Sequence, residues 1–155
     1  MSDERDIAGV IAPPPLIYAG ALAVGLLSSR RYPVAFLPRG ARFKLGWAML
    51  AAGAFVGFSG ERALHGAGTN VDPYRPTTAF VTDGPYRFTR NPLYLSLTLV
   101  YAGVSALANS LWAILLLPGV LAVMRRGVIE REERYLEERF GEEYRLYKAR
   151  VRRWI

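Results

Sequence analysis

The sequence contains no cysteine and only one histidine, His65. Without cysteine the chain can form neither a disulfide nor a thiolate metal site, and a single histidine cannot hold a metal ion by itself. We therefore predict no metal site, and we expect His65 to be a loop residue and not a catalytic base. The chain also lacks the Gly-rich strand–turn–helix motif of Rossmann-type nucleotide-binding proteins, which argues against that fold.

Charged residues are missing from three long blocks, residues 7–29, 45–60 and 93–124. Soluble domains interleave charged and apolar residues on the helix or strand period, whereas uncharged blocks of this length indicate membrane spans. The first block follows an acidic start and contains no clear small-residue cleavage site. We therefore interpret it as a retained span and not as a signal peptide.

These blocks predict one all-α domain over residues 1–155, a polytopic membrane protein with four transmembrane helices. The proline triplet that ends at Pro15 delays the start of the first helix, and Asn109 and Ser110 divide the last block into a tight helical hairpin. Ser110 is a good N-cap for the second arm of that hairpin. The predicted spans are residues 15–29, 45–60, 93–108 and 111–124.

The chain carries 20 basic and 13 acidic residues, which gives a net charge of +7. The basic residues flank the apolar blocks, where they would meet anionic lipid headgroups, and no nucleic-acid-binding motif is present. We therefore predict contacts with membrane lipids and none with nucleic acid. The basic residues favour both termini in the cytoplasm, which places segments 61–92 and 125–155 on the cytoplasmic face of the cell membrane. Five basic residues between 30 and 44 argue against this orientation.

Two segments outside the spans have their own signals. Residues 60–89 are rich in Gly, Pro, Asn and Asp, which predicts turns and extended chain, with residues 78–82 as a candidate short strand. A structured loop of this length in a small protein is usually functional. Residues 125–155 contain charge pairs at i,i+4 spacing and predict two amphipathic helices separated at Gly141.

In the first of these amphipathic helices, carboxylates interrupt the apolar stripe formed by Ile129, Leu136 and Phe140. Glu133 lies on the stripe itself, and Glu132 lies on the neighbouring row. A carboxylate in such a position is a candidate site residue. The alternative is that this face lies at the membrane surface, where a glutamate side chain reaches water.

The segment Arg90-Asn91-Pro92-Leu93-Tyr94 stands where the polar chain opens into the longest uncharged block. The prolines in and just before this segment leave its backbone few conformations, which suits a site more than a flexible loop. Arg90 can hold a carboxylate through two parallel hydrogen bonds, which lysine cannot do. The alternative is an arginine that anchors the hairpin by reaching the membrane interface.

Near the end of the sequence, Tyr144, Tyr147 and Arg150 follow one another at helical spacing, so that Arg150 lies beside two aromatic residues. The alternative is an aromatic belt at the membrane interface, which we favour for Trp154. We expect the two other arginines of this region to face lipid: Arg152 and Arg153. Together, these candidates predict a pocket at the membrane surface. It would offer arginines for an anion, carboxylates for a cation or for hydroxyls, and aromatics for a ring or a sulfonium.

The order and spacing of these pieces resembles the isoprenylcysteine carboxyl methyltransferase family, which is grouped with the phospholipid methyltransferases. The resemblance covers about residues 78–154, half of the chain, and the first two spans match only in being apolar. In chain order its motifs are Gly84-Pro85-Tyr86, Arg90-Asn91-Pro92-Leu93-Tyr94, the helical hairpin, Glu132-Glu133, and Leu136, Phe140, Gly141, Tyr144, Tyr147, Arg150 and Val151.

The resemblance implies an integral membrane enzyme that uses S-adenosylmethionine and releases S-adenosylhomocysteine. Carried over residue by residue, it implies the following cofactor-binding residues: Tyr86, Asn91, Pro92, Tyr94, Glu132 and Glu133. Arg90 and Arg150 match two arginines implicated in catalysis or in orienting a carboxylate of substrate or cofactor. Asn91 stands where eukaryotic members have histidine. Asparagine can hydrogen-bond but cannot titrate, so it cannot be a general base.

The implied activity is methyl transfer to a lipophilic acceptor that arrives laterally from the bilayer, most like O-methylation of an isoprenylcysteine carboxylate. The methyl sulfonium is already activated and a carboxylate attacks it without losing a proton, so the enzyme contributes alignment and exclusion of water. The first alternative is a phospholipid or other amine N-methyltransferase, which needs a base, with Glu132 or Glu133 as candidates. The second alternative is a non-catalytic membrane scaffold protein.

Overall fold

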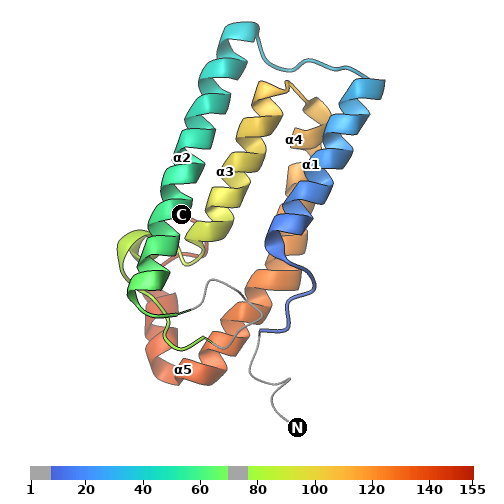
Figure 1. Cartoon of the computed structure of the whole chain (residues 1–155). Helices are drawn as coiled ribbons and strands as arrows, with labels where there is room; N and C mark the ends of the chain where they lie inside the picture. The colour runs from blue at the N-terminus through green and yellow to red at the C-terminus, as the bar shows by residue number, and fades with distance from the viewer. Residues whose placement is uncertain (1–7, 70–76) are drawn as a thin grey trace.

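The computed structural model describes residues 8–69 and 77–155, and within these ranges every regular element is helical (Figure 1). The elements in chain order are α1 (Pro14–Arg31), α2 (Arg39–Gly66), the 3₁₀-helix η1 (Gly84–Arg87), α3 (Pro92–Leu107), α4 (Leu111–Met124), the π-helical turn η2 (Arg125–Ile129) and α5 (Glu130–Arg150). The prediction of an all-α chain is confirmed for this part of the molecule.

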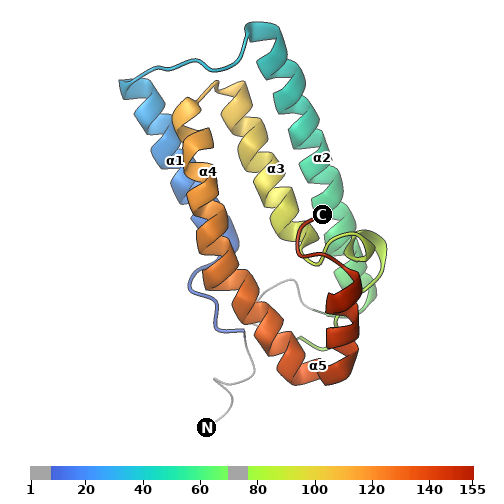
Figure 2. The same ribbon diagram turned by 180° about the vertical axis from the view of Figure 1, so that it is seen from behind.

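Helices α1 to α4 stand side by side as a bundle, with α2 packed on α3 and α1 packed on α4 (Figures 1 and 2). Helix α4 runs through η2 into α5 without a break, and α5 crosses beneath the bundle before the chain turns back toward α2 and α3. The segment before α3, the start of α5 and the last residues therefore meet at one end of the bundle.

A row of glycines brings α2 and α3 into close contact. Gly46, Gly53 and Gly60 repeat every seven residues on α2 and are buried against α3. A Cβ atom on Gly53 would lie only 2.9 Å from Cγ2 of Val100, and Ser96 Oγ donates a 2.7 Å hydrogen bond to the Gly53 carbonyl. Small residues that let two backbones approach are typical of membrane helix pairs. The glycines of this span therefore act in packing.

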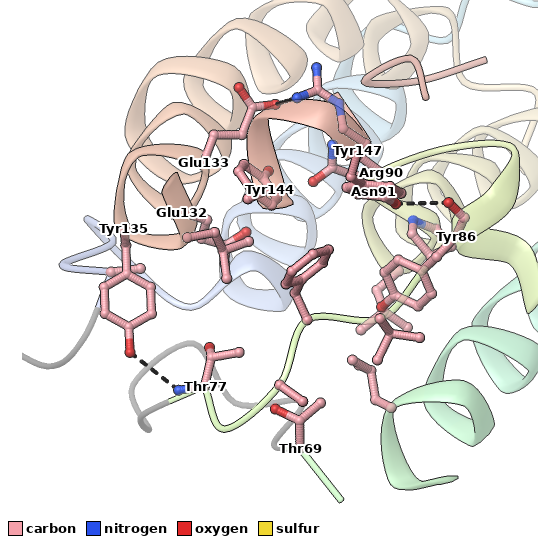
Figure 3. Close-up of a pocket in the computed structure, with 18 of the residues that line it drawn as sticks. Thr69, Thr77, Tyr86, Arg90, Asn91, Glu132, Glu133, Tyr135, Tyr144 and Tyr147 are labelled. Atoms are coloured by element: carbon pink, nitrogen blue, oxygen red, sulfur yellow. Dashed lines mark hydrogen bonds and ion pairs between the residues drawn. The ribbon is translucent and has the colours of Figure 1, made fainter. Parts of the chain in front are cut away.

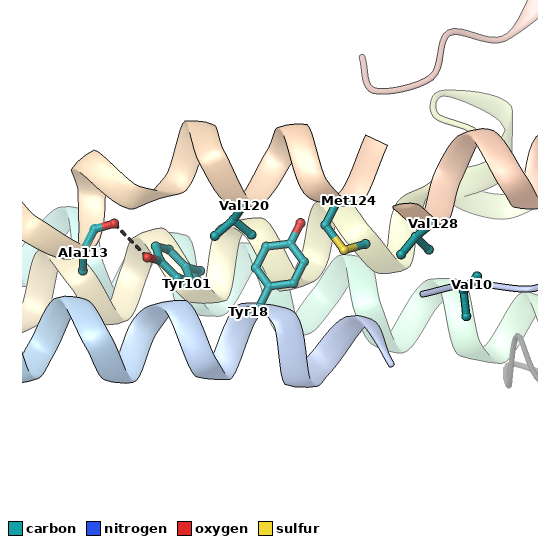
Figure 4. Packing of buried hydrophobic residues seen from close by; sticks show 7 residues of the cluster. All are labelled: Val10, Tyr18, Tyr101, Ala113, Val120, Met124 and Val128. Carbon is teal, nitrogen blue, oxygen red and sulfur yellow. Dashed lines mark hydrogen bonds between the residues drawn. The ribbon is translucent and has the colours of Figure 1, made fainter. Parts of the chain in front are cut away.

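The apolar core lies between α1, α3, α4 and η2 (Figure 4). Its buried members are Val10, Tyr18, Tyr101, Ala113, Val120, Met124 and Val128. The polar groups that enter it are paired, because an unpaired buried hydroxyl would be costly. The Tyr101 hydroxyl donates to the Ala113 carbonyl over 2.8 Å, and the hydroxyls of Ser29 and Ser110 lie 2.6 Å apart.

The predicted helical hairpin and its cap are confirmed. Asn109 adopts a left-handed conformation with φ of 51°, and Ser110 Oγ accepts a 3.1 Å hydrogen bond from the backbone N–H of Ala113. The Asn109 side-chain oxygen also accepts from the backbone N–H groups of Phe36 and Leu37. The turn is thus fixed both by its own cap and by the loop between α1 and α2.

Among the described residues, two helices are long and apolar enough to cross a membrane: α2 and the stretch Leu111–Arg150, which joins α4 to α5. A third, Pro92–Leu107, is apolar but shorter. The four-span arrangement therefore stays a prediction. Helix α2 is also longer than the predicted span 45–60, because only Pro38 stops it upstream, and the basic residues that follow continue the helix.

One predicted element is wrong and one predicted break is confirmed. Residues 78–82 form irregular chain with a bend at residue 78 and no partner strand among the described residues, and a strand requires a neighbour to pair with. The predicted turns at 70–76 lie outside the described residues. Gly141 has φ of 56° and interrupts α5, as the sequence predicts. Glycine adopts this conformation without the steric cost that a Cβ atom brings.

Candidate active site

A pocket opens at the end of the bundle where η1, the start of α3 and both parts of α5 meet (Figure 3). Its volume is about 140 Å³. The lining residues are Ala8, Leu64, Thr69, Thr77, Ala79, Phe80, Val81, Tyr86, Arg90, Asn91, Pro92, Leu93, Tyr94, Glu132, Glu133, Tyr135, Leu136, Tyr144 and Tyr147. They come from segments that are far apart in the sequence.

Seven of the eight predicted site residues line this pocket: Tyr86, Arg90, Asn91, Pro92, Tyr94, Glu132 and Glu133. The exception is Arg150, which is exposed and donates a 3.3 Å hydrogen bond to the Leu146 carbonyl one turn earlier in its own helix. The structure therefore does not bring Arg150 to the other residues. Its role in the site stays a prediction.

Glu133 is held between two arginines. Arg153 donates from Nε to one carboxylate oxygen over 2.9 Å and from Nη2 to the other over 2.8 Å. Nη1 of Arg90 lies 3.2 Å from the first oxygen, and only 7% of the Glu133 side chain is exposed. The alternative in which this carboxylate reaches water at a membrane surface does not describe Glu133.

The prediction that Arg153 faces lipid is wrong. Helix α5 ends at Arg150, and Val151 adopts an extended conformation that turns the following residues back toward the pocket. The side chain of Arg153 is 24% exposed and forms the two-pronged pair with Glu133. No local sequence pattern predicts this contact, because the two residues lie twenty positions apart on different sides of the Gly141 break.

Two donor atoms of the Arg90 side chain have no hydrogen-bond partner among the described residues. Its side chain is 9% exposed, and its Nε and Nη1 atoms are buried without a hydrogen-bond partner among the described residues. The approach of Nη1 to Glu133 is therefore an ion pair without hydrogen-bond alignment. A buried donor left unpaired is costly, and a guanidinium group fits the two oxygens of a carboxylate. The pocket thus offers an anion site.

Glu132 differs from its neighbour because it has no ion-pair partner among the described residues. Instead, the Tyr94 hydroxyl donates a 2.5 Å hydrogen bond to its Oε1 atom. Burial raises the pKa of Glu132 to about 7, the Tyr94 hydrogen bond lowers it, and the charge of Glu133 raises it further. At neutral pH this carboxyl group can therefore either hold or accept a proton.

Aromatic rings form one wall of the pocket. The Phe80 ring lies 5.7 Å from the Tyr144 ring and 5.8 Å from the Tyr147 ring, and the Tyr147 hydroxyl donates to the Tyr86 carbonyl over 2.7 Å. Burial raises the pKa of Tyr144 to about 12 and that of Tyr86 still further, so both are neutral phenols at pH 7. Such a wall suits a flat ring or a cation. Sequence reasoning missed Phe80, which lies in the segment predicted as a strand.

Asn91 is buried and faces the last residues of the chain. Its Nδ2 atom donates a 2.9 Å hydrogen bond to the Arg153 carbonyl, and its backbone N–H donates to Thr89 Oγ1 over 3.2 Å. Pro92 then forms the first turn of α3, where its missing N–H is not needed. The segment that carries Arg90 is thus fixed on both sides.

Within the described residues, two helices of membrane-spanning length and a shorter apolar one accompany a pocket that is lined by charged and aromatic side chains, so the protein is a helical one with membrane-length helices. The sequence model of the phospholipid methyltransferase family matches residues 41–143, well over half of the chain, and the chain belongs to this family. This agrees with the resemblance to the isoprenylcysteine carboxyl methyltransferases. Family membership implies a membrane methyltransferase.

Two curated proteins are similar over part of the chain. An uncharacterized protein of Haemophilus influenzae is 46% identical over 65 residues, which cover 41% of this chain and all of that protein. The cobalt-zinc-cadmium resistance protein CzcN of Cupriavidus metallidurans is 37% identical over 68 residues, which cover 44% of this chain and 32% of that protein. The chain thus matches about a third of CzcN. No solved structure matches the chain.

Proposed function

We propose that this protein transfers a methyl group from S-adenosylmethionine to a lipophilic acceptor at the cytoplasmic face of the membrane. The observation that carries the proposal is the convergence of seven motif residues, from η1, the segment before α3, α3 itself and α5, on one pocket. A scaffold without catalytic function would not need buried donors without partners, such as those of Arg90.

The residues present fit the cofactor. Nε and Nη1 of Arg90 would take its carboxylate, since both are buried and unpaired within the described part of the chain. The wall formed by Phe80, Tyr144 and Tyr147 would accept the adenine ring or the sulfonium. When bound, S-adenosylmethionine supplies an activated methyl group that needs no further activation by the protein.

The chain itself would contribute alignment and a dry site. Asn91 and Pro92 fix the start of α3, so that Arg90 and Tyr94 point into the same pocket. Tyr86 and Tyr144 stay neutral at pH 7 because burial raises the pKa of both groups. For a carboxylate acceptor, as in isoprenylcysteine O-methylation, this is sufficient, because no proton has to be removed.

A second candidate, N-methylation of a phospholipid or other amine, is favoured by Glu132. An amine acceptor must lose a proton, and Glu132 is a buried carboxyl group in the pocket with a pKa near neutrality, raised to about 7 by burial. Glu133 is unsuited to this role because both of its oxygens accept hydrogen bonds from Arg153. Glu132 would be the general base.

The first experiment is titration calorimetry of the detergent-purified protein with S-adenosylhomocysteine. We expect binding in the micromolar range. Folded protein that does not bind S-adenosylhomocysteine would overturn the proposal and favour the interpretation as a non-catalytic scaffold. If binding is found, a cofactor labelled in its methyl group is offered with prenylated cysteine carboxylates and, separately, with aminophospholipids. The labelled product then decides between O- and N-methylation.

A further inference from the structure

The last five residues, 151–155, which we call the tail, fold back onto the segment that carries Arg90. The Arg90 backbone N–H donates to the Arg152 carbonyl over 3.0 Å. Thr89 Oγ1 and Asn91 Nδ2 both donate to the Arg153 carbonyl, over 3.1 and 2.9 Å. Three consecutive residues before α3 are therefore bonded to two consecutive carbonyls of the tail.

The same tail also contacts Glu133, one of the residues that line the pocket. The guanidinium of Arg153 uses Nε and Nη2 to hold both oxygens of Glu133, and its Nη1 atom lies 3.7 Å from Oε1 of Glu130. This is the planar two-pronged geometry in which arginine and carboxylate bind most strongly. Lysine cannot reproduce it, because an ammonium group is a point charge.

This pair has a consequence for Arg90, which approaches the same carboxylate from the other side at 3.2 Å. Because Arg153 already holds both Glu133 oxygens, Arg90 is attracted by their charge but is not hydrogen-bonded through Nε or Nη1. Without Arg153, Glu133 would be the nearest carboxylate for the Arg90 fork, and the two would close into a pair of their own. The Nε and Nη1 donors of Arg90 would then be hydrogen-bonded to Glu133 and could not bind a ligand.

We propose that Arg153 is a positioning residue: by occupying both oxygens of Glu133, it keeps the Arg90 donors free for the carboxylate of a bound ligand. The inference rests on the proposed function, in which that ligand carries an amino-acid end. It assigns to Arg153 a place in the site that the sequence motifs gave to Arg150, which is exposed on the outside of α5.

The test compares two ligands by titration calorimetry. S-Adenosylhomocysteine has the amino-acid carboxylate, and methylthioadenosine has the same nucleoside without it. We expect Arg153→Ala to weaken binding of S-adenosylhomocysteine at least about tenfold, because the variant removes one partner of a charge pair whose carboxylate is buried. Methylthioadenosine should bind as in the wild type. Arg153→Lys should lie between Ala and the wild type. The matched control is Arg145→Ala, which removes an exposed ion pair at 2.9 Å on the preceding helix α5 and should change neither affinity.

The possible outcomes separate the two proposals. Wild-type protein that does not bind S-adenosylhomocysteine contradicts the proposed function. Wild-type protein that binds, with unchanged binding in Arg153→Ala, contradicts the role of Arg153. An equal loss for both ligands also contradicts it, because that pattern reports a general structural role. If Arg153→Ala does not fold, the same comparison is made with Arg153→Lys, whose charge is preserved.

Discussion

Glu132 and Glu133 are adjacent in the sequence and yet have different partners. Glu133 forms ion pairs with Arg153 and Arg90, whereas Glu132 accepts a hydrogen bond from the neutral hydroxyl of Tyr94. The difference arises because consecutive residues of a helix point in directions about 100° apart. One side chain reaches the tail and the other reaches α3. The pocket therefore has one carboxylate held by two arginines and one carboxyl group whose pKa burial raises to about 7.

The protonation of Glu132 should be visible in the pH dependence of stability. Burial raises its pKa from 4.5 to about 7 in the folded state. Between these values the folded protein keeps a proton that the unfolded chain releases, so the free energy of unfolding should fall as the pH rises toward 7. We expect the thermal midpoint of the wild type to drop between pH 5 and pH 8 relative to that of Glu132→Gln. Parallel midpoints of the two proteins would show that Glu132 ionises normally.

The site residues that sequence reasoning found are those whose signal is local. Tyr86, the segment Arg90-Asn91-Pro92-Leu93-Tyr94 and the Glu132-Glu133 pair are short motifs, and the structure gathers them in one pocket. Phe80 and Arg153 were missed because their contacts depend on how the chain folds back. A helical wheel that continues α5 past Arg150 gives the wrong position for Arg153, because the helix ends at Arg150 and the next residue is extended.

At the scale of the elements, the contact between α2 and α3 depends on glycine. A Cβ atom on Gly53 would meet Val100 Cγ2 at 2.9 Å and the Ser96 carbonyl oxygen at 3.1 Å. The backbone oxygen cannot move aside as a side chain can, so the two helices would have to separate. The close approach of α2 places Leu64 and Thr69 at the pocket, so this seam also supports the site.

We therefore expect Gly53→Ala to destabilise the protein by about 1–3 kcal/mol through overpacking. The matched control is Gly20→Ala on α1, where nothing lies within 4 Å of the added Cβ atom. That change should leave stability unchanged or raise it by up to about 1 kcal/mol, since alanine favours the helix. Thermal unfolding in detergent measures both variants. A loss of similar size in the two would show that the α2–α3 contact is not the cause.

Much of the helix pattern followed from the sequence, and the exceptions have physical causes. The hairpin was predictable because Asn109 and Ser110 are the polar break in an uncharged block, and the break at Gly141 because glycine ends helices readily. The start of α2 was not predictable from apolarity, because residues 39–44 are charged but contain no proline. The candidate strand at 78–82 failed because strand propensity forms no strand without a partner.

At the scale of the whole molecule, the pocket lies at one end of the bundle, and the loop between α1 and α2 lies at the other end (Figure 1). The proposed orientation puts the pocket at the cytoplasmic face of the membrane. Since the chain has no cysteine, single cysteines can be introduced without background. We expect Arg145→Cys to react with a membrane-impermeant maleimide only from the cytoplasmic side and Arg39→Cys only from the opposite side. The reverse pattern would invert the orientation and leave the pocket itself unchanged.

The length of α3 bears on how a lipid would reach the pocket. Its 16 residues span roughly 24 Å at a helical rise of about 1.5 Å, which is less than the ~30 Å thickness of a hydrocarbon core. If the tip of the hairpin lies level with one surface of the bilayer, Arg90 and Tyr94 lie several ångströms beneath the opposite one. A lipid headgroup would then move a short way below the bilayer surface to reach the pocket, while its acyl chains remain in the hydrocarbon core. The protein would work best in thin bilayers.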